Sequence, residues 1–158
     1  PSFRDAFVKR RCVVPADGFY EWGGKKGARQ PFWFHPKGGG LLRMAGLYEG
    51  WKDPETGEVL RTFTILTTPS NGLVKQLHER MPALLAEGEL DQWLGEAADE
   101  EAEALLRPAE ADLLEMRPVS PRVNAVTHDD PSLLEEVRPE APAARTRAGQ
   151  TLPLFKLD

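Results

Sequence analysis

The sequence predicts an α+β fold in one domain of ordinary size. Strand-like runs fill the first half of the chain, and helical patterns follow in the second half. Strands that precede helices, with hairpin-like turns between them, favour an α+β arrangement over a doubly wound parallel sheet. The chain has 158 residues, of which 41% are apolar, so it can bury a sizeable core.

Turn residues divide the first half of the chain into strands. Runs rich in Val, Ile, Thr and aromatic residues, bounded by Gly, Pro and Asp, predict strands over residues 11–15, 31–36, 41–51 and 59–67. The segment Asp53–Gly57 has the composition of a hairpin loop, and the glycines at 38–40 are expected to form a second hairpin tip.

Most helices are predicted in the second half. Ser70 is a favourable N-cap for a helix over residues 71–79, which Pro82 is expected to end. Shorter helices are expected at 3–10, 89–94, 97–106 and 131–136, and a last strand at 112–119.

The composition changes near the end of the chain. From Arg138 onward Pro, Ala, Arg and Thr dominate and large apolar residues are few, which predicts a flexible tail. The chain is therefore expected to consist of a domain over residues 1–137 and a tail over residues 138–158.

Charge is distributed unevenly along the chain. Residues 87–115 contain eleven acidic residues and one basic residue, a net charge of −10, whereas the rest has nineteen basic and fourteen acidic residues, a net charge of +5. Phosphate contacts need only a local positive surface, so the overall charge of −5 does not exclude nucleic acid. It does make nonspecific binding of duplex DNA less favourable.

Other bulk features exclude several classes of protein. No apolar run is long enough to cross a bilayer, so no membrane partner is expected. The single cysteine excludes an internal disulfide framework and a four-cysteine zinc site. A cytoplasmic protein, associated with the nucleoid if bacterial, is the simplest expectation.

The segment Arg10–Trp22 carries the first candidate for a chemical role. A short strand is broken by Pro15, and Glu21 follows between the aromatic residues Tyr20 and Trp22. A carboxylate enclosed by aromatic side chains is poorly solvated, which favours its protonated form and suits general acid or base work. The alternative is an exposed carboxylate at a strand end, without a function.

The segment Gln76–Pro82 carries the second candidate, His78. An imidazole can move protons near pH 7, and the end of a helix favours its charged form. The alternative is a histidine that only caps the last carbonyls of that helix. We expect Glu21 and His78 to converge on one pocket.

Four further residues are candidates for contacts with a single DNA strand. Trp22 and Phe19 can offer aromatic faces on which a base stacks. Arg80 and Thr68 flank His78 and are candidates for contacts with phosphate or sugar. A structural ion pair of Arg80 with Glu79 or another neighbouring residue is an equal alternative. The other tryptophans are expected in the core or at its edge: Trp33, Trp51 and Trp93.

Several reactive residue types have simpler explanations. Cys12, between Arg11 and Val13 in a predicted strand, is expected to be a buried small hydrophobe and not a nucleophile. His35 and His128 lack partners at metal-binding spacing. The glycines at 38–40 lack the Lys-Ser/Thr pair of a phosphate-binding loop. No metal and no nucleotide cofactor are expected.

Together, the two motifs resemble the signatures of the SOS response-associated peptidase family, whose members process abasic sites. The resemblance extends over about residues 1–137. Connecting segments are similar too: Pro31–His35, Met44–Trp51, Phe63–Thr68 and Pro118–Asn124. The resemblance to this family implies a curved mixed sheet that closes partly into a barrel, flanked by helices, with a DNA groove across one face.

The resemblance also implies a chemistry. Family members link covalently to abasic sites in single-stranded DNA through an N-terminal cysteine, which is exposed by autoproteolytic removal of the initiator methionine. Its amine and thiol close a thiazolidine ring on the sugar aldehyde. Glu21 would move protons during ring closure and crosslink release, and His78 would polarise the ring oxygen or hydroxyl of the sugar.

This chain is similar to the C-terminal part of the family's domain. It begins at Pro1 and does not contain the family's Cys-Gly-Arg segment, so by itself it is expected to be inactive in crosslinking. Two alternatives remain: a peptidase that acts in trans through Glu21 and His78, and a noncatalytic module that binds single-stranded DNA.

The end of the tail resembles a different kind of motif. The segment Gln150–Phe155 is similar to the short peptides by which bacterial repair proteins bind the replication sliding clamp. In that mode Leu152, Leu154 and Phe155 would enter an apolar cleft, with Gln150 at its rim. The clamp is therefore a candidate partner.

Overall fold

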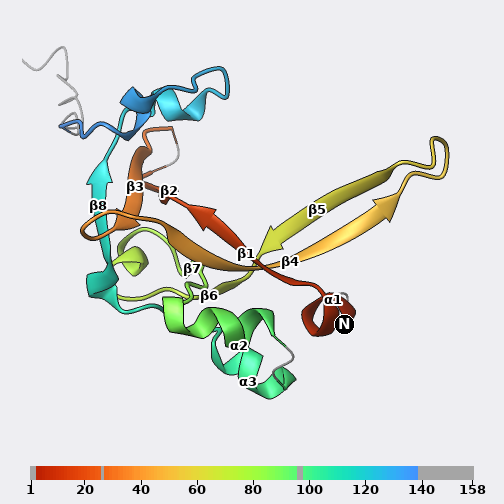
Figure 1. The fold of residues 1–158 in the computed structure, drawn as a ribbon. Helices are drawn as coiled ribbons and strands as arrows, with labels where there is room; N and C mark the ends of the chain where they lie inside the picture. Colours follow the sequence, from red (N-terminus) through yellow and green to blue (C-terminus); the bar gives the residue numbers. More distant parts are fainter. Residues whose placement is uncertain (1–2, 26, 96–97, 139–158) are drawn as a thin grey trace, which may run out of the picture.

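The computed structural model describes residues 3–25, 27–95 and 98–138 (Figure 1). The predicted α+β class is confirmed, because antiparallel sheets are combined with a few short helices. Among the described residues every strand pairing is antiparallel and the strands form three separate sheets, so the sheet is not mixed and the expected partial barrel is not confirmed.

The first sheet has the order β1-β4-β5. Helix α1 (Arg4–Lys9) leads into β1 (Arg11–Ala16), which pairs with the first half of β4 (Leu42–Lys52). Strand β5 (Val59–Ile65) pairs with β4 along its far half. Figure 1 shows that β4 and β5 project well beyond the rest of the molecule, and we call their outer parts, residues 48–52 and 59–63, the arm.

The predicted loop at the tip of the arm is confirmed. The Asp53 carboxylate accepts a hydrogen bond of 2.8 Å from the Glu55 backbone N–H, and Gly57 supplies a positive φ of 76°. This is the Asx-type turn that its composition predicts.

The second sheet has the order β2-β3-β8. Its strands are β2 (Phe19–Gly23), β3 (Gln30–Pro36) and β8 (Leu114–Pro118). The glycines at 38–40, all with positive φ, join β3 to β4 in the other sheet, so the predicted hairpin tip is wrong. A left-handed backbone there lets the chain cross between sheets.

The third sheet pairs β6 (Thr67–Pro69) with β7 (Arg80–Pro82). The predicted helix over 71–79 is wrong, because it is only a single 3₁₀ turn, η1 (Val74–Gln76). Asn71, and not Ser70, caps this turn, since its side-chain oxygen accepts the backbone N–H of Val74 at 3.0 Å. Because β6 pairs with β7, the segment between these strands has room for only one turn of helix. Pro82 does not end a helix; it is the last residue of β7.

The remaining elements are short. The predicted helices near 89–94 and 97–106 are present, whereas the one at 131–136 is a 3₁₀ turn. These elements are η2 (Glu87–Glu89), α2 (Leu90–Leu94), α3 (Asp99–Ala104), η3 (Ala111–Leu113), η4 (Pro121–Asn124) and η5 (Pro131–Leu134). No helix in residues 3–25, 27–95 and 98–138 is long and apolar enough to span a bilayer.

Two apolar clusters form the core. One lies between β4 and the α2–α3 region and centres on Trp93, which is fully buried. The other lies between the sheets and includes Phe34, Met44 and Met81. The core placement of Trp93 and Trp33 is confirmed, because both are buried. The second cluster joins residues of β2 and β3 to Met81 of β7.

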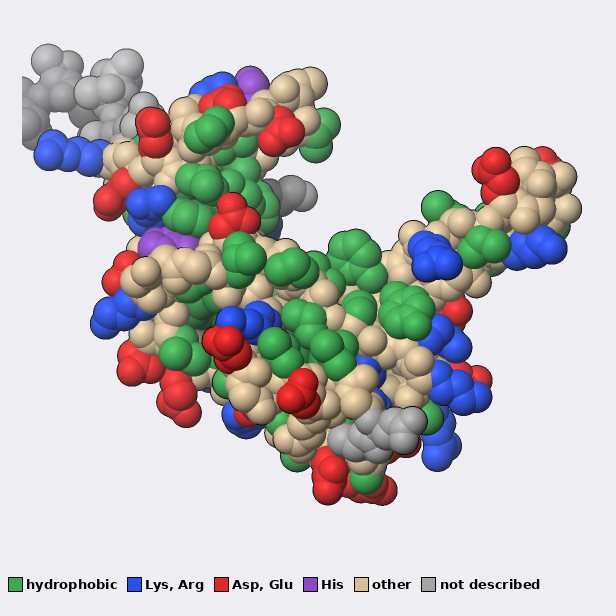
Figure 2. All heavy atoms as spheres, viewed as in Figure 1, with side chains coloured by type: hydrophobic (Ala, Val, Ile, Leu, Met, Phe, Trp, Pro, Cys, Tyr) green, Lys and Arg blue, Asp and Glu red, His purple; other side chains and the backbone are tan. Residues whose placement is uncertain are grey.

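The core placement of Trp51 is wrong. Its side chain is 54% exposed because it lies on the arm, where little packs against it. Other large apolar side chains of the arm are exposed as well: Tyr48, Val59, Leu60 and Phe63. Figure 2 shows hydrophobic side chains along this projection, between basic ones.

Candidate functional site

Glu21 and His78 meet at the junction of the second and third sheets. Glu21 lies in the middle of β2, and His78 lies between η1 and β7. The distance from Glu21 Oε1 to His78 Nδ1 is 3.9 Å, and the two side chains are 23% and 52% exposed. The predicted proximity of these two residues is confirmed.

The surroundings of Glu21 differ from the prediction. Side chains alternate along a strand, so Glu21 shares its face of β2 with Phe19, while Tyr20 and Trp22 lie on the opposite face. Across the ladder, Glu21 is paired with Phe32, which packs against the core. The aromatic residue that flanks the carboxylate on its own face is therefore a cross-strand partner and not a sequence neighbour.

The imidazole of His78 is anchored on one side only. Its Nδ1 lies 2.9 Å from the Arg80 carbonyl oxygen and 3.1 Å from the Arg80 backbone nitrogen. A neutral ring protonated at Nε2 accepts the Arg80 N–H, whereas a charged ring donates Nδ1–H to the carbonyl oxygen or toward Glu21. Nε2 has no hydrogen-bond partner among the described residues, so it is free to face a ligand.

His78 is not at a helix end. The residues before it form one 3₁₀ turn, and the residue that holds its ring belongs to a strand. The predicted effect of a helix dipole and the alternative of a helix-capping histidine are therefore both wrong. The strand backbone of β7 provides the support instead.

Arg80 is held by Thr67 and not by Glu79. Its Nε donates to the Thr67 hydroxyl at 3.0 Å, and one terminal nitrogen donates to the same hydroxyl at 2.8 Å. In the part of the chain that the structure describes, Arg80 forms no ion pair with Glu79. The other terminal nitrogen of Arg80 has no partner there, and the residue is exposed.

Thr68 is an unsuitable ligand contact. It is only 2% exposed, and its hydroxyl donates to the Pro69 carbonyl at 3.1 Å. Neighbouring strand residues face opposite sides, so exposed Thr67 lies beside Arg80 while Thr68 lies in the interior opposite Met81. Thr67 is the threonine that the sequence reasoning missed.

The two aromatic candidates occupy different faces of β2. Phe19 stacks on Phe34 with ring centroids 5.1 Å apart, so one face of its ring is already covered. Trp22 is partly exposed, and its indole N–H donates to the Asn124 side chain at 2.8 Å. It lines an open hollow with Arg29 and Asn124. Trp22 is therefore the better stacking surface, but it lies on the far side of β2 from Glu21.

The remaining candidates for reactive side chains are Cys12, His35 and His128, and each lies against neighbouring residues of the fold. Cys12 is half-buried opposite Gly46, and burial raises the pKa of its thiol above the ordinary value. His35 stacks on Trp33 at 4.3 Å, and His128 Nδ1 lies 2.8 Å from the Arg122 carbonyl. Among the described residues no three His, Cys, Asp or Glu side chains are grouped to hold a metal.

Charge is segregated in space as well as in sequence. Acidic side chains gather over α2 and α3 in Figure 2.

Comparisons with known proteins identify relatives of this chain. Over 140 residues the chain is 39% identical to abasic site processing protein YoqW of Bacillus subtilis, covering 85% of this chain and 61% of that protein. It is 39% identical over 155 residues to abasic site processing protein HMCES of Gallus gallus, covering 84% of this chain and 46% of that protein.

A solved structure supports the same relationship. A protein from Bacteroides thetaiotaomicron superposes with a TM-score of 0.81 at 30% identity, covering 87% of this chain and 61% of that one. The chain thus spans less than two thirds of the length of these relatives. The model of the SOS response associated peptidase (SRAP) family matches residues 1–126. The chain belongs to the SRAP family.

Proposed function

We propose that this chain is part of a protein that recognises abasic sites in single-stranded DNA and bonds to them reversibly. The curated relatives carry the name abasic site processing protein, which supports a response to this lesion. The observation that carries the proposal is the 3.9 Å approach of Glu21 to His78, an acid and a base at one partly exposed point.

The proposed reaction joins the N-terminal cysteine of the family to the open-chain sugar. The α-amine adds to the aldehyde carbon, the resulting hydroxyl leaves as water, and the thiol adds to the iminium carbon with loss of its proton. Glu21 donates a proton to the departing water and accepts the one that the thiol releases. That cysteine lies outside these 158 residues, so this chain supplies the acid and base only.

His78 is proposed to prepare the sugar for this attack. Its Nε2 is free, while Nδ1 stays on the Arg80 backbone in either protonation state. A hydrogen bond from Nε2–H to the ring oxygen of the sugar favours the open aldehyde. The same pair can work in reverse to release the crosslink, and autoproteolytic removal of the initiator methionine is proposed for the same site.

Strand binding is proposed to use Arg80 and Trp22. Thr67 holds the Arg80 guanidinium, which leaves one terminal nitrogen for a phosphate oxygen. Trp22 would stack on a neighbouring base. Phe19 is covered on one side and Thr68 is buried, so neither is retained in this set.

The test compares two forms of the protein with single-stranded DNA that contains an abasic site. The chain that begins at Pro1 is expected to bind it without forming an adduct that survives SDS. A form that carries the family's N-terminal cysteine is expected to form that adduct. A robust adduct from the shorter chain would show that the nucleophile is assigned wrongly.

Two other functions predict different results. A peptidase acting in trans would cleave peptides without the N-terminal cysteine, and its activity would depend on Glu21 and His78. A noncatalytic single-strand binder would keep its crosslinking and release rates after Glu21→Gln. The approach of an acid to an imidazole favours a proton-transfer function over the noncatalytic binder. The dependence on the N-terminal cysteine distinguishes the proposed function from the peptidase.

A further inference from the structure

Asn124 binds the tryptophan that the proposed function uses. It ends η4 in the segment Pro118–Asn124, and its side-chain oxygen accepts the Trp22 indole N–H at 2.8 Å. An indole N–H can only donate, so the partner must be the amide oxygen, which fixes how the amide is turned. This bond joins residues 102 positions apart and sets the plane of the Trp22 ring.

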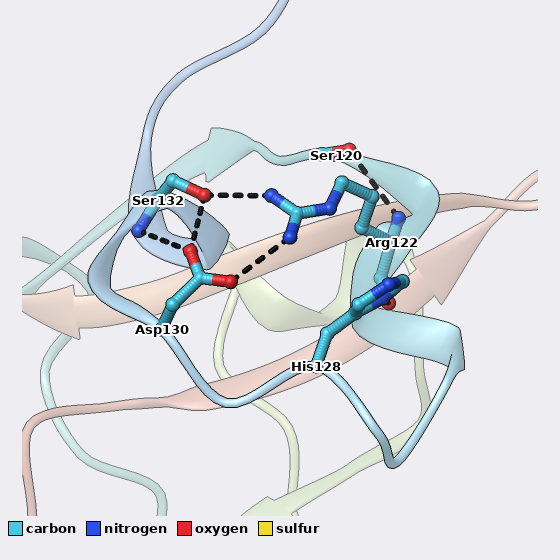
Figure 3. A network of polar contacts seen from close by, with 5 residues as sticks. All are labelled: Ser120, Arg122, His128, Asp130 and Ser132. Carbon is cyan, nitrogen blue, oxygen red and sulfur yellow. Dashed lines mark hydrogen bonds and ion pairs between the residues drawn. The ribbon is translucent and has the colours of Figure 1, made fainter.

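The loop that carries Asn124 is held by a polar network, shown in Figure 3. The Arg122 guanidinium donates to the Asp130 carboxylate at 2.9 Å and to the Ser132 hydroxyl at 2.8 Å. The Ser120 hydroxyl accepts the Arg122 backbone N–H at 3.3 Å, and the His128 ring lies against the Arg122 carbonyl. Four side chains thus converge on Arg122, two positions before Asn124.

The ends of this loop are also fixed. The Val137 backbone N–H donates to the Pro118 carbonyl at 3.0 Å, and Val119 and Glu136 form a β-bridge. Leu133, in η5 of the same loop, is buried with 8% exposure. A loop closed at its base and cross-linked through Arg122 keeps the position of Asn124 relative to β2.

The indole lies at an open hollow. Trp22, Arg29 and Asn124 line it together with Pro121, and Arg29 is exposed. A ring held by its N–H keeps one orientation in the lining of this hollow, whereas a free ring would rotate about its side-chain bonds. Loss of that freedom before binding lowers the entropic cost of stacking.

We propose that Asn124 is a positioning residue that presents Trp22 to a nucleobase beside the lesion. The Arg122–Asp130–Ser132 network keeps Asn124 in place. This inference rests on the proposed function, because it takes Trp22 as the surface on which a base stacks.

The experiment uses the chain and a single-stranded oligonucleotide with 2-aminopurine next to a tetrahydrofuran abasic analogue. Quenching of 2-aminopurine at saturation reports stacking, and a titration reports affinity. Asn124→Leu removes the acceptor and is expected to weaken binding about fivefold and to reduce quenching, as for loss of one hydrogen bond. Asn124→Asp keeps an acceptor oxygen and is expected to restore quenching, although its charge weakens affinity.

A double-substitution cycle separates positioning from structural support. If Asn124 acts through Trp22, Asn124→Leu has no further effect once Trp22→Phe has removed the indole N–H. Equal losses in both backgrounds, or unchanged quenching in Asn124→Leu, would overturn the inference. If Asn124→Leu does not fold, Ser132→Ala loosens the network with Asn124 intact and is expected to reduce quenching partially. Full quenching in that variant would count against the network's role.

Failure of the proposed function has a different signature. If Trp22→Ala, which removes the aromatic ring, binds and quenches like the unsubstituted chain, Trp22 is not the stacking surface, and the inference falls with it. If Trp22→Ala reduces quenching but Asn124→Leu does not, the proposed use of Trp22 stands and only the role of Asn124 is refuted.

Discussion

Glu21 Oε1 lies 3.9 Å from His78 Nδ1, which is too long for a hydrogen bond and short enough for an ion pair once the imidazole is charged. Glu21 comes from β2, whereas His78 comes from the segment between η1 and β7. The Arg80 backbone contacts the same nitrogen. A small shift of the charged ring therefore decides whether Nδ1–H donates to the Arg80 carbonyl oxygen or to the Glu21 carboxylate. Such an arrangement allows a proton to move without a large rearrangement.

Replacing Glu21 with Gln is expected to slow crosslink formation and release roughly 100-fold or more. The amide keeps the shape of the side chain but cannot exchange a proton. The measurement is the rate of SDS-resistant adduct formation in a form of the protein that carries the family's N-terminal cysteine. Glu87→Gln is the matched control, because that carboxylate lies at the exposed acidic end beside Arg43. Equal rates for all three proteins would remove Glu21 from the mechanism.

Thr67 and Thr68 are expected to respond differently to replacement by Val. Thr67→Val removes the hydroxyl that holds the Arg80 guanidinium, so the affinity for single-stranded DNA should fall about three- to tenfold with little change in stability. Thr68→Val removes a buried bond to the Pro69 carbonyl and should lower the free energy of unfolding by about 1 kcal/mol without a change in affinity. Anisotropy titrations and urea unfolding measure the two effects. The reverse pattern would restore Thr68 as the contact residue.

Cys12 is expected to react slowly with iodoacetamide near neutral pH. Burial raises the pKa of its thiol, so the reactive thiolate forms at higher pH than in a free cysteine. Alkylation rates, followed by mass spectrometry between pH 7 and 10, should increase at a higher pH for Cys12 than for the cysteine of an unstructured peptide. Cys12→Ala is expected to leave DNA binding intact. Fast alkylation at pH 7 would contradict the half-buried placement and the raised pKa of the thiol.

Asp130 is expected to stabilise the loop after β8 except in acid. Hydrogen bonds from Ser132, together with the charge of Arg122, hold the pKa of Asp130 below its ordinary value. A carboxylate with a lowered pKa stabilises the folded state above its unfolded pKa of about 4, and this contribution disappears as the pH falls through the folded value. The difference in unfolding free energy between the unsubstituted chain and Asp130→Asn should be constant above about pH 5 and shrink below it. A difference independent of pH would show that the carboxylate is not the stabilising group.

The end of the tail lies outside the described residues, and its predicted role is tested by binding. A peptide of residues 148–158 is expected to bind a bacterial sliding clamp with an affinity that calorimetry can detect at high micromolar concentration. A peptide with Leu154→Ala and Phe155→Ala is the control and should not bind. No heat from the unsubstituted peptide would refute the clamp as a partner.

The sequence predicted well those features that depend on short-range chemistry. The strands of the first sheet follow β-branched and aromatic runs bounded by turn residues, and Asp53–Gly57 forms the turn that its composition favours. The proximity of Glu21 and His78 was predicted from the two motifs that contain them, and not from the sequence between these motifs. Trp93 was assigned to the core because a large apolar ring is usually buried.

The errors arise where tertiary pairing overrides local preference. Residues 71–79 have a helical pattern, but pairing of β6 with β7 leaves room for only one turn. The choice between Thr67 and Thr68 depends on which residue faces Arg80, and this register is fixed by Met81, which must be buried. Likewise, the surroundings of Glu21 are set by its cross-strand partner Phe32, which a single sequence does not reveal.

The arm has a practical consequence for work with the isolated chain. A ribbon of two strands is only marginally stable in water without a third strand or a packed face, and a bare strand edge is a template for addition of further chains. Phe63, at 63% exposure, places an aromatic ring beside that edge. Concentrated samples of this polypeptide should therefore oligomerise reversibly through the ribbon, and a lysine at position 63 is a rational solubilising change before crystallisation or NMR.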